Sequence, residues 1–138
     1  MIRLLDTGPL VALLREDDPA HGWASTTLTN MPGPLHTCDA VVTETCYLLR
    51  QITGGRKHVL AMIREGSLVI EPVLARESAA VEKLLDAYGP RMDLADACLV
   101  RLSELHRRSL VITLDSDFRF YRKNGREMIP LLAPFAVA

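Results

Sequence analysis

The chain has 138 residues, which is enough for one domain with a hydrophobic core and too few for two domains of ordinary size. Its 16 basic and 17 acidic residues give a net charge of -1, which excludes binding of nucleic acid by bulk positive charge. Aromatic residues make up only 5% of the chain, which argues against a base-stacking platform.

The first half of the chain is predicted to alternate between short apolar strands and helices. Pro9 and Pro19 suit the first turn of a helix, and Asp39 suits an N-cap position. The expected elements are strand 2–5, helix 9–15, helix 19–30, strand 35–37, helix 39–51, helix 57–65 and strand 68–70.

The second half continues this alternation. Gly89 and Pro90 end one predicted helix, and Asp93 is predicted to cap the next. The expected elements are helix 78–88, helix 94–107, strand 110–114, one helical turn within 118–123 and an edge strand within 128–132. Strands that alternate with helices predict a single α/β domain, residues 1–138, whose parallel sheet is covered on both faces.

Two aspartates directly follow predicted strands: Asp6 follows strand 2–5, and Asp115 follows strand 110–114. Ligands of parallel α/β sheets bind beyond the carboxyl ends of the strands, so these two acids meet if their strands are neighbours. Aspartate is also common in turns and caps, and that structural explanation stays open for either residue alone.

Further acids lie on predicted helices. Asp93 and Asp96 share one helix face at spacing i, i+3, and Asp93 fits an N-cap. Capping explains Asp96 less well, because a capping box prefers Glu or Gln at that position. Glu44 lies in a mostly apolar stretch, where a buried charge needs a partner or a metal ion, although an isolated helical Glu is ordinarily solvated.

The sequence offers no lysine or arginine beside these carboxylates. Two carboxylates about 4 Å apart repel by about 4 kcal/mol at an effective dielectric of 20, and a divalent cation relieves such repulsion. Oxygen ligands select hard cations, so we expect one or two ions of Mg²⁺ or Mn²⁺ before zinc. The four histidines show no ligand spacing to the acids or to each other.

Four short motifs contain these acids, in this chain order: Leu4-Leu5-Asp6-Thr7-Gly8, Val42-Thr43-Glu44-Thr45, Asp93-Leu94-Ala95-Asp96-Ala97 and Thr113-Leu114-Asp115-Ser116-Asp117-Phe118. With them the sequence resembles the PIN-domain nucleases, and in particular the VapC-type toxins of bacterial and archaeal toxin–antitoxin pairs. The resemblance covers essentially the whole chain. It implies a PIN-like three-layer α/β/α fold with a central parallel sheet of about four to five strands.

The resemblance also implies roles for single residues. The four catalytic and metal-binding acids would be Asp6, Glu44, Asp96 and Asp115. Asp93 and Asp117 match further acidic positions, and Asp93 either joins the metal site or only caps its helix. Thr7 and Thr113 match positions whose hydroxyls support the acids.

The activity that the resemblance implies is metal-dependent endonucleolytic hydrolysis of RNA, with a 5′-phosphate product. The ion would activate water and neutralise charge on the phosphate. The implied partners are an RNA substrate, a second copy of the chain in a homodimer, and a small antitoxin. The antitoxin's C-terminal segment would wrap the toxin and place a basic side chain in the acidic site.

Basic residues are in excess between positions 107 and 126, which makes this segment a candidate phosphate track. Its proposed RNA contacts are Arg119, Arg122 and Lys123. A second candidate is Arg50 with Arg56 and Lys57. Solvated basic helix ends explain both groups equally well.

Other functions compete with the toxin interpretation. Asp115-Ser116-Asp117 superficially resembles the Asp-x-Asp motif of haloacid-dehalogenase-type phosphatases, but that motif should follow the first strand, which here carries only Asp6. A receiver domain would need a late lysine after an apolar strand, which the chain lacks. A non-catalytic module whose acidic pocket docks a basic partner and a PIN nuclease of RNA processing, or one acting on DNA, stay open.

The three cysteines, Cys38, Cys46 and Cys98, lie in apolar stretches without metal-ligand spacing. This pattern predicts reduced, buried thiols in a cytosolic protein. The N-terminus has no basic segment followed by a long apolar run, so no signal peptide is expected. No apolar stretch reaches the roughly 18 residues of a membrane span, and we expect a cytoplasmic location.

Overall fold

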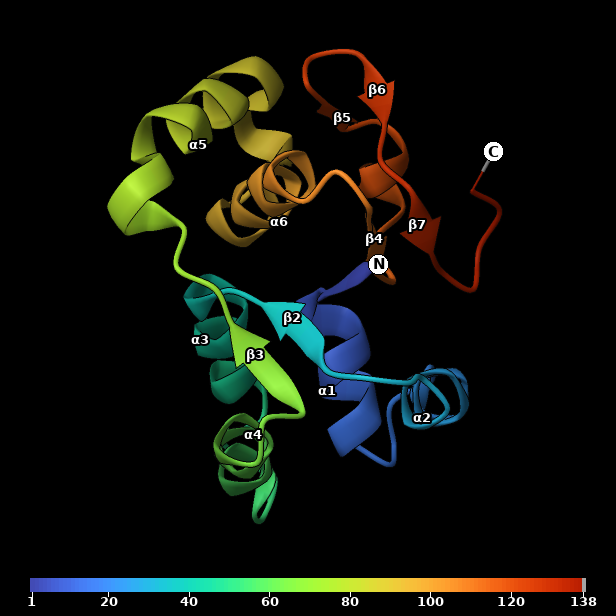
Figure 1. Cartoon of the computed structure of the whole chain (residues 1–138). Helices are drawn as coiled ribbons and strands as arrows, with labels where there is room; N and C mark the ends of the chain where they lie inside the picture. The colour runs from blue at the N-terminus through green and yellow to red at the C-terminus, as the bar shows by residue number, and fades with distance from the viewer. Residues whose placement is uncertain (138) are drawn as a thin grey trace.

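Short apolar strands form a central sheet, and helices cover both of its faces (Figure 1). The computed structural model describes residues 1–137. Its main strands are β1 (Ile2–Leu5), β2 (Leu35–Thr37), β3 (Leu68–Ile70), β4 (Ser109–Ile112) and β7 (Leu131–Leu132). All are parallel, in the order β3-β2-β1-β4-β7, so β1 and β4 lie side by side at the centre. The predicted three-layer α/β/α fold with a parallel sheet is confirmed.

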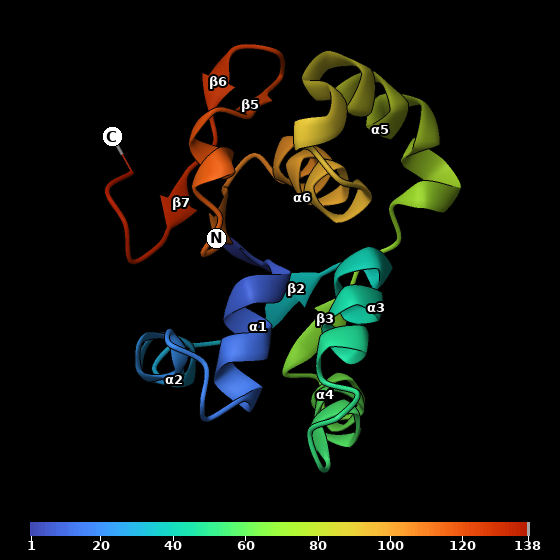
Figure 2. The same ribbon diagram turned by 180° about the vertical axis from the view of Figure 1, so that it is seen from behind.

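The helices form two layers and one bridge between them. The layer on one face holds α1 (Thr7–Leu14), α2 (His21–Thr29) and α4 (Gly55–Arg64), and the other holds α5 (Leu74–Tyr88) and α6 (Leu94–Leu105). Helix α3 (Asp39–Leu48) contacts α1, α4 and α6, and the view from behind shows it beside α1 and α4 (Figure 2). Within residues 1–137, none of these helices combines the length and the apolar character that crossing a membrane requires.

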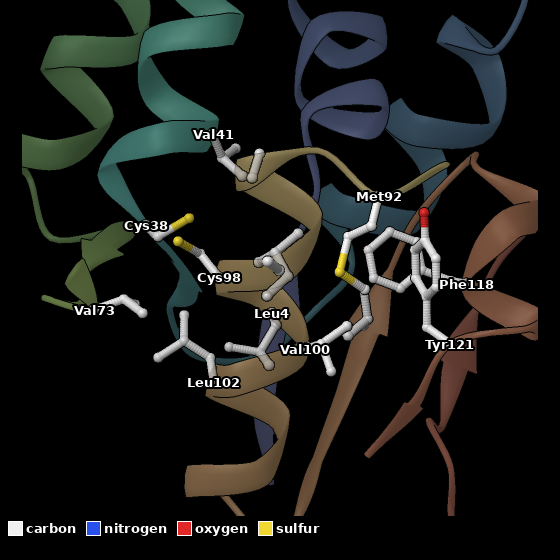
Figure 3. Packing of buried hydrophobic residues seen from close by; sticks show 14 of the residues in the cluster. Leu4, Cys38, Val41, Val73, Met92, Cys98, Val100, Leu102, Phe118 and Tyr121 are labelled. Atoms are coloured by element: carbon white, nitrogen blue, oxygen red, sulfur yellow. The ribbon is translucent and has the colours of Figure 1, made fainter. Parts of the chain in front are cut away.

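Alternation along the central strands builds two hydrophobic cores. Leu4 and Val111 point to the side of α5 and α6, whereas Leu5 and Ile112 point to the side of α1, α2 and α4. All four side chains are fully buried. The core under α5 and α6 also contains the rings of Phe118 and Tyr121 and the sulfurs of Met92, Cys38 and Cys98 (Figure 3). Two cores back to back hold β1 and β4 rigidly, and this packing also fixes the residues just beyond their carboxyl ends.

Most predicted helix boundaries agree with the structure to within about three residues. The predicted start of helix 78–88 is wrong: α5 begins at Leu74 and is kinked at Glu77 (φ −121°, ψ 18°), just before the predicted start. Helix α3 begins at Asp39 itself, and Cys38 occupies its N-cap position. The predicted strand 110–114 is shorter and ends at Ile112.

The C-terminal part differs more from the prediction. The helical turn expected within 118–123 is the short 3-10 helix η2 (Ser116–Arg119), and a second 3-10 turn, η1 (Gly89–Arg91), precedes α6. The residues after η2 form a separate antiparallel hairpin of β5 (Arg122–Lys123) and β6 (Glu127–Met128). Its turn contains Asn124 and Gly125, both with positive φ, which is the conformation that an Asn-Gly turn favours. The expected edge strand is therefore split into β6 and β7.

Candidate active site

The carboxyl ends of β1 and β4 place Asp6 beside Thr113. Leu5 pairs with Ile112 in the parallel register, so the next residue of each strand lies at the same edge of the sheet. The Thr113 hydroxyl donates to Asp6 Oδ2 at 2.7 Å, and the backbone N–H of Thr7 donates to Asp6 Oδ1 at 2.8 Å. Asp6 is only 6% exposed, and both of its oxygens are held.

The same threonine positions Asp115. The backbone N–H of Asp115 donates to the Thr113 hydroxyl at 2.9 Å, so a single hydroxyl connects Asp6 to Asp115. Asp115 lies three residues beyond the end of β4 rather than directly after it, and this contact holds the intervening chain in place. Asp115 Oδ1 in turn accepts from the backbone N–H of Asp117 at 2.9 Å.

Asp93 and Asp96 form a capping box at the start of α6. The Asp96 N–H donates to Asp93 Oδ1 at 2.8 Å, and the Asp93 N–H donates to Asp96 Oδ2 at 3.3 Å. The expectation that capping explains Asp96 less well is wrong, because aspartate closes the box here as glutamate would. Asp96 nevertheless has a second partner, the hydroxyl of Tyr121, which lies 3.2 Å from Oδ2 and 3.0 Å from the Arg91 carbonyl.

Tyr121 is a residue of this site that the sequence analysis missed. Its side chain is fully buried, and its ring packs edge-on against Tyr88 and Phe118. Burial, followed by the charge of Asp96, raises the pKa of its phenol, which therefore keeps its proton. The tyrosine is distant from Asp96 in the sequence and belongs to no motif, so no local pattern indicates the contact.

Carboxylates from four segments line one pocket of about 350 Å³. Helix α3 contributes Glu44, which is half-buried, and no lysine or arginine is among the lining residues. The pocket is lined by Asp6, Thr7, Gly8, Glu44, Leu48, Asp93, Asp96, Leu114 and Asp115. Of the acids that the sequence predicts, Asp117 is the one outside this lining.

The electrostatics of the pocket favour protons on Asp6 and Asp96. Burial raises the pKa of Asp6 from 3.8 to about 6, and the charges of Asp115 and Glu44 add to the rise, while hydrogen bonds from Thr113 and Thr7 oppose it. Burial and then the charge of Asp93 raise the pKa of Asp96 to about 7. The site therefore has an excess of negative charge that its own residues do not balance.

Comparison with known families identifies this architecture. The model of the PIN domain matches residues 3–124, most of the chain. The chain belongs to the PIN-domain family. Members of this family are typically nucleases that hydrolyse phosphodiesters, and they generally depend on metal ions.

A solved structure with the same fold is the VapC20 toxin of Mycobacterium tuberculosis, which is described as cleaving the sarcin–ricin loop. It matches this PIN domain with a TM-score of 0.74 and 24% sequence identity, over 93% of this chain and 99% of that chain. At this identity the likeness shows the fold. No curated protein sequence matches the chain.

The donor chemistry of the pocket in this PIN domain suits a hard cation. Carboxylate oxygens predominate, and the Thr7 hydroxyl is buried without a hydrogen-bond partner, so an oxygen donor at the pocket has spare capacity. In residues 1–137, however, no three His, Cys, Asp or Glu side chains are arranged to hold an ion. Several carboxylate oxygens are instead turned toward protein N–H and O–H groups. Thr7 thus contributes its N–H to Asp6, and its hydroxyl does not support an acid.

The three predicted RNA contacts differ in their burial and in their hydrogen-bond partners. Lys123 is only 6% exposed and is withdrawn from the surface, which corrects its assignment. Arg119 stacks over Phe135 at 5.5 Å and donates to the Ser116 carbonyl. Arg122 donates to the carbonyl of Arg119 at 2.7 Å.

The predicted phosphate track is also divided by the fold. Arg107 and Arg108 precede β4 and lie at the amino edge of the sheet, whereas the acids lie at its carboxyl edge. A larger pocket of about 600 Å³, between α5, α6 and the β5–β6 hairpin, is lined by Lys83, Arg101 and Arg122. Its one acid, Glu104, pairs with Arg101 at 3.0 Å, so the excess charge of this pocket is positive, opposite to that of the acidic pocket.

Proposed function

We propose that this PIN domain is a metal-dependent endoribonuclease, and that it is the toxin of a toxin–antitoxin pair. The observation that carries the proposal is the convergence of five carboxylates from four separate segments on one pocket without a lining lysine or arginine. Carboxylates this close together repel one another, and a divalent ion bound between them would offset that repulsion. An acidic pocket that only docks a basic partner would not need Thr113 and Tyr121 to position two of the acids.

The residues have separate roles in this proposal. Asp6, Glu44, Asp96 and Asp115 would hold Mg²⁺ or Mn²⁺, with Asp93 at the rim of the same pocket. The ion, when bound, supplies Lewis-acid chemistry: it lowers the pKa of water and stabilises negative charge on the phosphate. Thr113 fixes the direction of the Asp6 carboxylate, and Tyr121 does the same for Asp96, so that both acids are oriented before substrate arrives.

A neighbouring groove provides a place for RNA. The groove of about 580 Å³ shares Glu44 and Asp93 with the acidic pocket and contains Tyr47, whose side chain is 62% exposed. Arg50 lies over the Tyr47 ring at 4.0 Å, so a cation and an aromatic face stand next to the acids. We assign the RNA contact to this pair, since arginine binds phosphate and tyrosine stacks on bases.

The same region supports the proposed protein inhibitor. Leu74 and Leu94 line the groove and are each 44% exposed, which leaves apolar surface for an antitoxin that displaces RNA. An antitoxin segment that ends in a basic side chain would complement the uncompensated acids beside it. Occupation of the acidic pocket by that side chain would keep RNA out.

The direct experiment is cleavage of a labelled RNA in Mg²⁺ or Mn²⁺. We expect cleavage by the wild type that stops in EDTA, and a loss of about 100-fold or more in Asp6→Asn and Asp96→Asn, because each variant removes one charge from the ion site. Asp86→Asn, at an exposed position of α5, is the matched control and should cleave normally. Full cleavage by both pocket variants would reject the proposal.

The toxin role has a separate test. A short reading frame next to this one should encode a small protein with a DNA-binding segment, and coexpression should relieve growth arrest caused by this chain. Growth arrest that Asp96→Asn abolishes and the small protein relieves is the expected result. Cleavage without arrest would favour a nuclease of RNA processing, and the absence of both cleavage and metal binding would favour a docking module.

A further inference from the structure

Two cysteines that are distant in the sequence lie against each other in the core under α5 and α6. Cys38 occupies the N-cap position of α3, and Cys98 lies in the second turn of α6. Their exposed fractions are 2% and 1%. Figure 3 shows the two sulfur atoms pointing toward each other across the boundary between the helices.

We propose that Cys38 and Cys98 are a redox modification site, at which a hydroperoxide converts the two thiols into a disulfide that ties α3 to α6. The third cysteine, Cys46, serves as an internal contrast. It lies on α3 but packs into the other core, on the side of α1 and α4, where no second cysteine is present. The site is therefore specific to one pair.

The pair is accessible to a small oxidant. A pocket of about 110 Å³ is lined by both cysteines and also by Asp39, Pro72 and Leu74, which are exposed. This volume is several times the roughly 15 Å³ that one water molecule requires. A molecule the size of hydrogen peroxide fits there, whereas a protein disulfide does not.

Local geometry favours Cys38 as the thiol that reacts first. A hydrogen bond from the Cys98 side chain lowers the pKa of the Cys38 thiol, and the backbone N–H groups of Val41 and Ala40 at the start of α3 add to this effect against the opposing effect of burial. A thiolate at a helix N-terminus is the nucleophilic form of cysteine. Cys98, next to it, is the partner that completes the disulfide.

The chemistry balances with hydrogen peroxide as the oxidant. The Cys38 sulfur attacks one peroxide oxygen, the O–O bond breaks, and a sulfenic acid and one water form. The Cys98 sulfur then attacks the Cys38 sulfur, the S–S bond forms, the S–O bond breaks, and the departing oxygen leaves as a second water with the Cys98 proton. Two thiols lose two electrons and two protons, and the peroxide is reduced to two waters.

The disulfide would act on the elements that carry the acidic pocket. Glu44 lies on α3, C-terminal to Cys38. Asp96 lies on α6, about half a helical turn before Cys98. A covalent link between the two helices would fix their separation. The link itself depends only on the two sulfurs, so it can be tested without any assay of RNA cleavage.

The decisive variant is Cys46→Ser, because Cys38 and Cys98 are then the only cysteines in the chain. After treatment with hydrogen peroxide, we expect a monomer that has lost about 2 Da, has no free thiol in urea, and yields a Cys38–Cys98 linked peptide. The midpoint of thermal unfolding should rise. A reductant should restore the two free thiols and lower the midpoint to its original value.

Wild type should give the same linked peptide with Cys46 still free, whereas Cys98→Ala should give none. Circular dichroism is the control that checks whether Cys98→Ala retains its fold. The proposal is overturned if treated Cys46→Ser keeps two free thiols, forms only disulfide-linked dimers, or gains oxygen at Cys38 without a linked peptide.

Discussion

Acids in two regions of this PIN domain have opposite surroundings. On the helical layer of α5 and α6, Arg101 lies 3.0 Å from both Glu77 and Glu104, so one cation serves two carboxylates. In the acidic pocket, Asp6 and Asp96 contact N–H and O–H groups and face other carboxylates, without a cation among the lining residues.

A cluster at the C-terminal end of α6 repeats the balanced pattern. Glu71 lies 2.9 Å from His36 Nδ1 and 2.7 Å from His106 Nε2, and the two rings meet edge-on at 6.5 Å. Acids that tie elements of the fold together are thus matched to basic groups. The difference indicates that the pocket acids do not stabilise the fold by pairing, and that their charge is available to an ion from outside.

The largest expected effect on stability follows from the pKa of Asp6. A carboxyl whose pKa rises from 3.8 to about 6 on folding stabilises the folded state when protonated, and this stability is lost as the pH rises through that range. At about 1.4 kcal/mol per pKa unit, the metal-free protein should lose about 2.4 kcal/mol between pH 4 and pH 7 through this group.

Asp6→Asn should remove that loss, since asparagine stays neutral and can keep the Thr113 contact. Urea unfolding in EDTA at pH 4, 5, 6 and 7 measures the effect, with Asp86→Asn as the charge-matched control. If the free energy of unfolding changed with pH in the same way for wild type and Asp6→Asn, the charge of Asp6 would not destabilise the folded state.

A somewhat smaller effect is expected from Thr113→Val, which keeps the shape and removes the hydroxyl. Both hydrogen bonds of that hydroxyl disappear, and the free energy of unfolding should fall by about 2 kcal/mol. RNA cleavage should fall by about 10- to 100-fold, because Asp6 loses its orientation. Thr113→Ser retains the hydroxyl and should restore most of both quantities; equal losses in Ser and Val would point to packing alone.

The smallest expected effect tests the ion pairs of Arg101 on the α5–α6 layer. Glu77→Gln weakens the contact to Arg101, and the free energy of unfolding at pH 7 should fall by about 1 kcal/mol, opposite in sign to Asp6→Asn. Glu82→Gln, an exposed position on the same helix, should be neutral. Cleavage should be unchanged in both variants, and a gain of stability in Glu77→Gln would remove the contrast between the regions.

The end of β1 and the start of α6 were predictable because local pattern determines them. Apolar runs and Asp6 indicated β1 and its edge, and capping chemistry indicated the start of α6 at Asp93. The hairpin of β5 and β6 was missed although Asn124-Gly125 is a strong turn signal, because its strands have only two residues each. The first turn of α5 was missed because the kink at Glu77 interrupts the helical spacing.

Contacts between segments that are distant in the chain could not be predicted from the sequence. The proximity of Tyr121 to Asp96 and of Cys38 to Cys98 depends on how α6 packs against the rest of the fold, and no spacing encodes it. Lys123 was assigned to RNA because it belongs to a local excess of basic residues, yet β5 turns its side chain inward. Asp6 was found because a residue that comes directly after a parallel strand lies at the carboxyl edge of the sheet.

Binding of Mn²⁺ to the metal-free protein tests the central claim most directly. At about 100 times the dissociation constant, Mn²⁺ should stabilise the wild type by about 2.7 kcal/mol, which would raise the midpoint of thermal unfolding by several degrees. Asp86→Asn should show the same rise, and Asp6→Asn and Asp96→Asn should show little. An unchanged midpoint in the wild type, or an equal rise in all four proteins, would contradict the assignment of the acidic pocket as an ion site.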